Sequence, residues 1–272
     1  MKQVFTISTD QTPRPENSLL SVRIGERHLG FCLTDLEDGS LQHLSWCTGQ
    51  QVSLPELDEF YRLHPQLSLA YTRINICYDH PKSVLVPLEF FQEAENRQLL
   101  ETGFGITGYD EVFTDDIKNW QIHNTYAVPA DIHQWVSGTF TKARYVHQYS
   151  VAIKNLVAIE EEALLLVDFR SEDFTVVVAR NNDLRLAQTF PYSSPSDVIY
   201  YLLRCCETFE LPGSGTRLSI SGLVDKESIL YRELYQYFLG IEFRLPEWPR
   251  VKGENYPSHF FTSLNDLAKC GS

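Results

Sequence analysis

The segment Gly103–Gly108 matches the pattern G-x-G-x-x-G, in which glycines let the backbone approach the pyrophosphate of a dinucleotide closely. That fingerprint has to follow a strand and open a helix. Here a predicted helix, about Leu88–Leu100, precedes it and a predicted strand, Glu111–Asp116, follows it, so we interpret it as a loop. The segment Leu211–Thr216 lacks the Gly-Lys-Ser/Thr end of a phosphate-binding loop and is predicted to connect a helix to a strand.

The eight histidines and six cysteines show no spacing that is typical of a metal site or a nucleophile. The H-E-x-x-H pattern is absent, and so is the C-x-x-C pair that zinc ribbons and thioredoxin-like sites require. No G-x-S-x-G elbow is present to expose a nucleophilic serine. We therefore expect no bound metal, and we expect the cysteines to be reduced and structural.

The charge of the chain argues against nucleic acid as a partner. Lys and Arg number 23 against 36 Asp and Glu, for a formal net charge of −13. Such a surface repels phosphate backbones unless basic residues cluster, and the sequence has no basic run; a cationic protein surface suits it better. No apolar stretch reaches the ~18 residues of a membrane span, and Met1–Gln11 does not read as a signal peptide. These features predict a cytoplasmic protein without membrane insertion.

The apolar patterns predict the same order of elements in two halves of the chain. Residues 1–16, rich in Thr, Pro and Gln, are interpreted as a loose arm. The predicted elements of the first half are strands Leu20–Ile24, Leu29–Leu33 and Leu41–Cys47, a helix from Pro55, strand Ile74–Tyr78, a helix at about Leu88–Leu100, strands Glu111–Asp116 and Gln121–Val128, and a helix from Pro129.

The second half repeats this order with stronger signals. Ser194, Pro195 and Asp197 form a typical helix start, with a hydroxyl N-cap, proline at the first position and a carboxylate in the first turn. The predicted strands are Ala163–Phe169, Phe174–Arg180, Leu184–Phe190, Leu218–Ile220 and a last one over Ile241, Phe243 and Leu245, and further helices begin after Asp225 and near Ser258.

The ribonuclease-H-like order of elements consists of three antiparallel strands, a helix, a parallel strand, a helix and another strand. Two such units in tandem resemble the actin-like ATPase superfamily, most closely its reduced bacterial members without extra insertions. Examples are the actin-like proteins of type IV pilus assembly and type II secretion. The chain also resembles a bacterial family catalogued as a domain of unknown function. The resemblance implies an α/β fold of two ribonuclease-H-like subdomains, residues 17–155 and 156–272, each with a mixed five-stranded sheet flanked by helices.

The same resemblance implies where a nucleotide would bind. Actin-like ATPases hold metal and phosphates with two hairpins that carry an Asp and glycines. In the first hairpin, Val22–Gly30, Arg23 stands where the Asp is expected. The second hairpin keeps Asp168 and Thr175 but has Phe169 and Arg170 in the glycine region, followed by Glu172 and Asp173. The residues implied for nucleotide contact are Asp168, Arg170, Ser171, Thr175, Ser221 and Gly222.

A nuclease is a further alternative, because ribonuclease-H-like enzymes place a carboxylate on the first strand. Two-metal cleavage needs several carboxylates at close range, and Glu207 and Asp225 are the available partners of Asp168. Acidic residues at helix starts and strand ends are more often caps or surface groups. The net charge of −13 also opposes a nucleic-acid substrate.

The aromatic residues suggest contacts with other proteins. Tyr231, Tyr235, Tyr237 and Phe238 cover more than one face of a single predicted helix, and interface cores are enriched in such residues. The degraded phosphate motifs favour a non-catalytic actin-like protein that serves as an interaction or assembly scaffold, with a protein partner or as a homodimer. No cofactor is required in this interpretation. A nucleotide-binding switch or ATPase that uses ATP and magnesium is the alternative.

Overall fold

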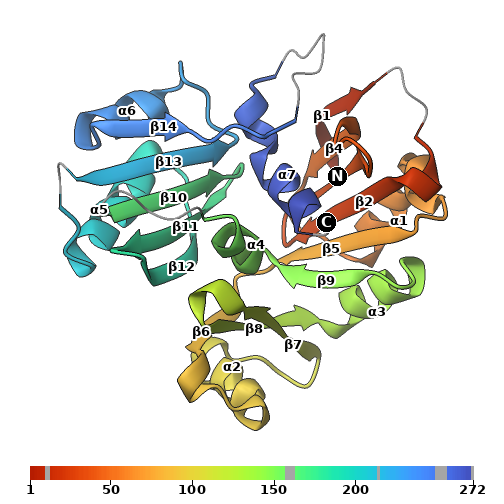
Figure 1. Cartoon of the computed structure of the whole chain (residues 1–272), viewed down its shortest axis with the longest axis horizontal. Helices are drawn as coiled ribbons and strands as arrows, with labels where there is room; N and C mark the ends of the chain where they lie inside the picture. The colour runs from red at the N-terminus through yellow and green to blue at the C-terminus, as the bar shows by residue number, and fades with distance from the viewer. Residues whose placement is uncertain (10–12, 157–162, 213–214, 249–255, 271–272) are drawn as a thin grey trace. The chain divides into compact units, whose positions relative to one another are not determined.

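The structure is a computed structural model that describes residues 1–9, 13–156, 163–212, 215–248 and 256–270 (Figure 1). The chain divides into two compact units. The first contains Met1–Lys154, Trp248–Gly253 and Asp266–Ser272, and the second contains Asn155–Glu247 and Glu254–Asn265. Parts of three predicted segments lie outside the described residues: 10–12 of the N-terminal arm, 213–214 of the connection Leu211–Thr216, and the final residues 271–272.

The main sheet of the first unit has six strands in the order β1-β4-β3-β2-β5-β9. Strands β1 to β4 pair antiparallel, whereas β5 is parallel to both β2 and β9. The bounds are β1 Lys2–Ser8, β2 Ser18–Gly25, β3 His28–Asp35, β4 Leu41–Thr48, β5 Arg73–Asp79 and β9 Arg144–His147, with helices α1 Leu54–Leu63, α3 Ala130–Thr139 and α4 Gln148–Lys154. One face of this sheet packs on α1 and α3 through a core that includes Val22, Ile76, Phe60 and Val136.

The prediction of a loose arm over residues 1–16 is wrong for its first part. Lys2–Ser8 form strand β1, which pairs with β4 and covers its outer edge. Only Phe5 and Ile7 of this strand are buried, and Phe5 stacks on Trp46 at 6.4 Å between ring centroids. Two inward-facing apolar residues among polar ones give a weak strand signal, so the pairing partner decides the conformation.

The first unit also contains a second, smaller sheet, which corrects the expectation of a single five-stranded sheet. The segment between β5 and α3 forms a separate antiparallel sheet in the order β6-β8-β7. Its bounds are β6 Ser83–Pro87, helix α2 Asn96–Phe104, β7 Asp110–Ile117 and β8 Ile122–Pro129. Helix α2 ends at Phe104, and Gly105 follows it as a left-handed C-cap with a φ of 62°. The G-x-G-x-x-G segment therefore spans the last turn of α2 and the loop to β7, so it connects a helix to a strand as the sequence predicts.

A buried polar network joins this small sheet to α4 and the end of β9. The Asn124 side chain on β8 donates to Ser150 Oγ at 2.9 Å. The backbone N–H of His147 donates to Asp115 on β7 at 2.7 Å, and His147 Nε2 lies 2.8 Å from the carbonyl oxygen of His80. Burial lowers the pKa of His147 to about 4, so the imidazole is neutral at pH 7 and donates to that carbonyl from Nε2.

The second unit is built on a mixed five-stranded sheet in the order β12-β11-β10-β13-β14. Its bounds are β10 Ala163–Phe169, β11 Asp173–Arg180, β12 Asp183–Pro191, α5 Pro195–Thr208, β13 Thr216–Gly222, α6 Ile229–Tyr237 and β14 Gly240–Phe243. These elements confirm the predicted ribonuclease-H-like order. The predicted start of α5 is present as a capping box, in which Asp197 accepts from the backbone N–H of Ser194 at 2.9 Å.

The core of the second unit lies on one face of its sheet. Alternate residues of β10, among them Leu165, Val167 and Phe169, pack against α5 and α6. The predicted C-terminal helix consists of a 3-10 turn, Ser258–Phe261, and helix α7, Thr262–Lys269. We expected this helix in the second half, but the division of the chain assigns its residues from Asp266 onward to the first unit. None of the helices within the described ranges has the length and hydropathy of a membrane-spanning segment.

Candidate functional site

Sheet register gathers the predicted residues of the second unit at the carboxyl end of β10. Asp168 lies opposite Thr175 of β11 and beside Ser221 of β13. Because its neighbours Val167 and Phe169 face the core, alternation places Asp168 on the other face of the sheet. Ser221 Oγ donates to Asp168 Oδ1 at 2.9 Å. Three residues that are far apart in sequence therefore meet on one sheet face, as the resemblance implies.

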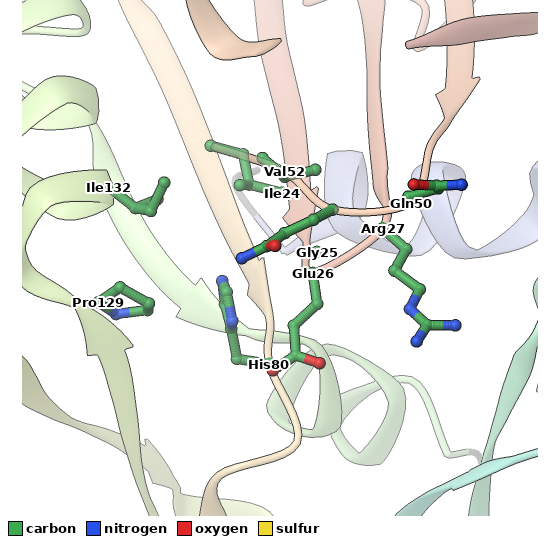
Figure 2. Close-up of a pocket in the computed structure, with 10 residues that line it drawn as sticks. Ile24, Gly25, Glu26, Arg27, Gln50, Val52, His80, Pro129 and Ile132 are labelled. Carbon is green, nitrogen blue, oxygen red and sulfur yellow. The ribbon is translucent and has the colours of Figure 1, made fainter. Parts of the chain in front are cut away.

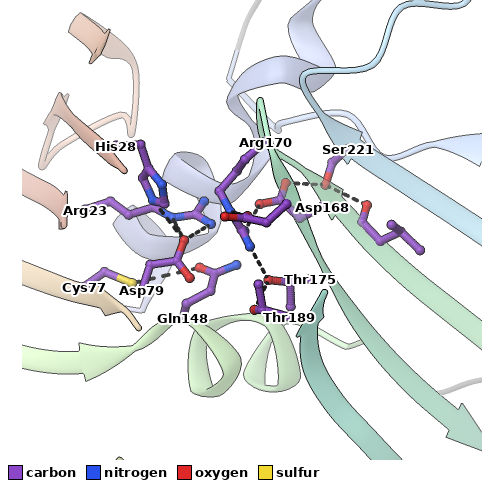
Figure 3. Close-up of polar contacts among 12 residues, drawn as sticks. Arg23, His28, Cys77, Asp79, Gln148, Asp168, Arg170, Thr175, Thr189 and Ser221 are labelled. Atoms are coloured by element: carbon purple, nitrogen blue, oxygen red, sulfur yellow. Dashed lines mark hydrogen bonds and ion pairs between the residues drawn. The ribbon is translucent and has the colours of Figure 1, made fainter. Parts of the chain in front are cut away.

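The Arg170 side chain packs against this cluster and contacts both Asp168 and Thr175. Its Nη1 lies 3.8 Å from Asp168 Oδ2, its Nη2 donates to Thr175 Oγ1 at 3.0 Å, and its Nε pairs with the Asp173 carboxylate (Figure 3). Arg170 and Asp168 are only 3% and 6% exposed. Tyr192 Oη donates to the carbonyl oxygen of Arg170 at 2.6 Å, which fixes the backbone at this position. The acid of the second hairpin is thus neutralised by an arginine of the same hairpin.

Ser171 and Gly222 have other places in the structure. Ser171 is exposed in the turn between β10 and β11, so it does not join the buried cluster. Gly222 ends β13 with a φ of 82°, and a Cβ there would lie 2.1 Å from the carbonyl oxygen of Phe169. The glycine is required because β13 approaches β10 this closely and because only glycine adopts this backbone conformation without strain.

The first unit carries a second buried charge cluster at the matching hairpin, β2–β3. Arg23 on β2 is fully buried, and its Nε and Nη2 donate to Asp79 Oδ2 at 3.1 and 2.7 Å. His28 Nε2 approaches the same oxygen at 2.9 Å, and Figure 3 shows both side chains directed at Asp79. Trp46 completes the cluster, since its ring lies 5.5 Å from Arg23 Cζ and stacks on His28 at 4.9 Å.

Two glycines of this hairpin make room for the rings of the cluster. A Cβ at Gly25 would lie 2.2 Å from the His28 ring, and one at Gly30 would lie 2.3 Å from the Trp46 ring. In the resembling ATPases such glycines let the backbone approach a phosphate. Here the space beside each glycine is filled by an aromatic side chain of the protein itself.

The sequence did not single out Asp79 or His28. Asp79 follows the predicted buried strand Ile74–Tyr78, and parallel pairing brings it beside Gly25 at the end of β2. A carboxylate at the end of one parallel strand, next to an arginine near the end of the first strand, is the signal that could have found the pair. His28 gives no comparable signal, because its ring reaches Asp79 only through the geometry of the hairpin.

A pocket of about 310 Å³ lies on the opposite face of the same strand ends (Figure 2). Strand alternation explains the separation: Arg23 and Asp79 face one side of the sheet, whereas Ile24 and His80 face the other. The pocket is lined by Ile24, Gly25, Glu26, Arg27, Gln50, Gln51, Val52, His80, Pro129 and Ile132. Burial lowers the pKa of His80 to about 4, so its ring is neutral at pH 7.

Neither the cysteines nor the remaining acids assemble a reactive centre among the described residues. Burial raises the pKa of Cys32 to about 12 and that of Cys205 to about 11, so these thiols stay protonated. Glu207 pairs with Arg204 on the surface of α5, and Asp225 accepts from the backbone N–H of Glu227 in the turn before α6. Within the described part of the chain, no group of three His, Cys, Asp or Glu side chains could hold a metal ion.

Two ribonuclease-H-like units in tandem define the actin-like ATPase fold, and solved structures share it. A Bacteroides thetaiotaomicron protein with an actin-like ATPase fold and unknown function matches with a TM-score of 0.80 and 19% identity, over 94% of this chain and 97% of that one. The PilM–PilN type IV pilus biogenesis complex matches with a TM-score of 0.65 and 13% identity, over 94% and 99%. The ethanolamine utilization protein EutJ from Carboxydothermus hydrogenoformans matches with a TM-score of 0.53 and 10% identity, over 94% and 91%.

The family is shown by the sequence itself. Residues 7–241 match the family model described as "Protein of unknown function (DUF3822)", so the chain belongs to this family. No curated protein matches the chain. The low identities to the solved structures show the fold alone.

Proposed function

We propose that the protein is a non-catalytic actin-like scaffold that works through protein contacts and requires no nucleotide. The observation that carries this proposal is the buried arginine at each hairpin. Arg23 is held by Asp79, and Arg170 is held by Asp168 and Asp173. A magnesium-nucleotide complex needs a carboxylate that is available to the metal or its waters. The carboxylates that occupy these positions already neutralise a cation of the protein.

The cost of opening either cluster supports the proposal. Separating a buried ion pair leaves an uncompensated charge, which costs about 3–5 kcal/mol when one partner is lost. In the first hairpin a phosphate would also have to displace the rings of His28 and Trp46 from Gly25 and Gly30. In the second hairpin, Glu172 and Asp173 would repel it.

Exposed apolar residues around α6 support the role of protein contacts. Tyr235 on α6 and Leu239 just after it are 58% and 78% exposed, and Ile229, Tyr237 and Leu245 are exposed as well. β14, which follows directly, pairs among the described strands only with β13. Aromatic and aliphatic side chains beside an open sheet edge are typical of protein interfaces. One protein of this fold, PilM, is in a complex with PilN.

Thermal unfolding with and without ATP and magnesium tests the absence of a nucleotide role. A ligand at ~100 times its dissociation constant adds about 2.7 kcal/mol, or a few degrees in Tm for a chain of this size. We expect no shift at millimolar ATP and no hydrolysis.

A double substitution tests the interface. We expect Tyr235→Ser combined with Leu239→Ser to abolish self-association, as measured by sedimentation velocity, or to abolish co-purification with a partner. Unchanged association in both measurements would contradict the proposed surface.

A nucleotide-binding switch or ATPase is the second candidate, because the structure does bring Asp168, Thr175 and Ser221 together. In that case Arg170 would swing from Asp168 to a phosphate. This candidate predicts a clear rise in Tm with ATP and magnesium, lost in Asp168→Ala. A rise that survives this substitution would place the nucleotide elsewhere.

A further inference from the structure

The pocket of the first unit contains a buried nitrogen that no described residue satisfies. His80 is 7% exposed, and among the described residues its Nε2 has no hydrogen-bond partner. Figure 2 shows this side chain between Pro129 and Glu26, reaching into the pocket. An unsatisfied buried nitrogen costs free energy, and native structures contain few of them. A ligand that forms a hydrogen bond with Nε2 would remove this cost.

The position and size of the pocket favour a compact molecule. It lies where the parallel strands β2 and β5 end, and open α/β sheets bind ligands beyond the carboxyl ends of their strands. Its volume is about 310 Å³, whereas a cavity of roughly 150 Å³ holds one benzene molecule. The pocket therefore suits a molecule with one ring or a short chain, and it is too small for a nucleotide.

One part of the lining is apolar and already in place. Ile24, Val52 and Ile132 line the pocket and belong to the buried core of the first unit. Pro129 lines it at the point where β8 ends and α3 begins. Because core packing holds these side chains, the site needs little rearrangement to accept a ligand, as is usual for small-molecule sites. They provide a surface for an aliphatic or aromatic body.

The charged residues of the lining already have other contacts. Glu26 and Arg27 each take part in an interaction within the protein, and Figure 2 shows the Arg27 side chain directed away from His80. A charged ligand would lose its hydration without gaining a counter-charge of its own, and that loss is costly. The lining therefore favours an uncharged ligand.

The polar groups that remain can both donate and accept. Burial lowers the pKa of His80 to about 4, so at pH 7 one ring nitrogen donates and the other accepts. Gln51 also lines the pocket, is exposed, and carries an uncharged amide with a donor and an acceptor. A ligand group that donates as well as accepts fits either tautomer of His80 and either orientation of the amide.

We propose that this pocket binds a compact, uncharged molecule that combines an apolar body with a carboxamide or hydroxyl group. That group forms hydrogen bonds with His80 Nε2 and with the Gln51 amide, and the apolar body packs on Ile24 and Ile132. The site lies on the sheet face opposite the charge cluster of Asp79, so the inference does not depend on the proposed scaffold role.

Thermal unfolding of the full chain with matched ring compounds is the first test. The uncharged probes are cyclohexanecarboxamide, benzamide and cyclohexylmethanol, and the charged ones of similar shape are cyclohexanecarboxylate and cyclohexylmethylammonium. At ~5 mM we expect an uncharged probe to raise Tm by about 2 °C or more and the charged probes to have no effect. The responses to the amides and to the alcohol distinguish the two polar groups. No rise with any uncharged probe, or an equal rise with a charged one, would overturn the proposal.

Methyl NMR of the isoleucine-labelled chain locates the bound probe. We expect the methyl resonances of Ile24 and Ile132 to shift as the probe is added. Ile220, in the core of the second unit, is the control and should keep its resonance. A rise in Tm without shifts at Ile24 and Ile132 would mean that the probe binds elsewhere, and it would overturn the assignment.

Substitution of His80 tests the polar contact. In His80→Phe a ring of similar size replaces the imidazole, so we expect the Kd of the probe to rise about tenfold or more in the same titration. Gln51→Ala, at an exposed residue, should leave the fold intact and also weaken binding. His123→Phe is the matched control, because His123 lies outside the pocket lining and its Nδ1 likewise has no partner among the described residues. An unchanged Kd in both His80→Phe and Gln51→Ala would overturn the proposed contacts.

Discussion

Arg23 and Asp79 form a buried ion pair between the neighbouring parallel strands β2 and β5, with Nη2 2.7 Å from Oδ2. In the second unit the equivalent strand carries the acid, Asp168, and the arginine follows it in the turn as Arg170. Each unit thus keeps a buried charge pair, with the arginine on the first hairpin strand in one unit and the acid on that strand in the other. The pair in the first unit yields the first prediction.

Replacing Asp79 by Asn should lower the free energy of unfolding by about 3–5 kcal/mol, because it removes the charge of a buried ion-pair partner of Arg23. Urea denaturation measures the loss. The double replacement Arg23→Met with Asp79→Leu should recover most of it, since buried ion pairs are often replaceable by apolar groups. Arg204→Ala, which breaks an exposed pair with Glu207, is the control and should cost less than about 1 kcal/mol. A loss of that small size in Asp79→Asn would show that the pair is not buried in solution.

The backbone of Gly222 predicts a strong difference between two glycines. Gly222→Ala should destabilise the protein by more than about 1 kcal/mol, because its φ is 82° and a Cβ would lie 2.1 Å from the Phe169 carbonyl oxygen. Gly138→Ala should instead stabilise it by about 0.5–1 kcal/mol, because Gly138 lies in helix α3 with open space around its Cα. Equal effects of the two substitutions in thermal unfolding would contradict this account.

Strand β1 should contribute to stability although it looks like an arm in the sequence. Phe5→Ala removes a buried ring and should cost about 3–5 kcal/mol. It should also increase hydrogen exchange at the β4 amides that pair with β1. Gln3→Ala, on the exposed side of the same strand, should change neither measurement by more than the error. Unchanged exchange of the β4 amides in Phe5→Ala would show that β1 does not hold this edge.

Two buried histidines predict a loss of stability in mild acid. Burial lowers the pKa values of His80 and His147 to about 4, below the ~6.5 of the unfolded chain. Between these values the unfolded chain binds more protons than the native protein, so the free energy of unfolding falls as the pH decreases. Asp115 opposes this change in part, because burial raises its pKa in the folded state.

Urea denaturation at several pH values between 7 and 4.5 should show a decrease on the order of 3 kcal/mol. Above pH 7 the contribution of the two histidines should be constant. His80→Gln removes one of the two groups and should make the dependence shallower. The same slope in the variant and the parent protein would mean that His80 is not held neutral by burial.

Much of the fold follows from local patterns. The alternation and apolar runs of Ala163–Phe169 and Ile74–Tyr78 predict the central strands, and Ser194, Pro195 and Asp197 predict the start of α5, because these signals depend on near neighbours alone. The smaller sheet was not predicted as a separate sheet. The sequence predicts two of its strands, but their pairing and the contacts that join the sheet to α4, such as that of Asn124 with Ser150, depend on segments far apart in the chain.

The candidate site divides in the same way. Sequence by itself determined the order of elements, the ribonuclease-H-like duplication and the replacement of the expected Asp by Arg23. The gathering of Asp168, Thr175 and Ser221 followed from the resemblance. Only the tertiary structure decided that Arg170 pairs with Asp168, that Arg23 and His28 both contact Asp79, and that His80 lines a pocket on the other face of the sheet. The physical reason is that side-chain pairing in a buried site depends on strand register and on which face of the sheet each residue occupies, and both are set by packing between segments far apart in the chain.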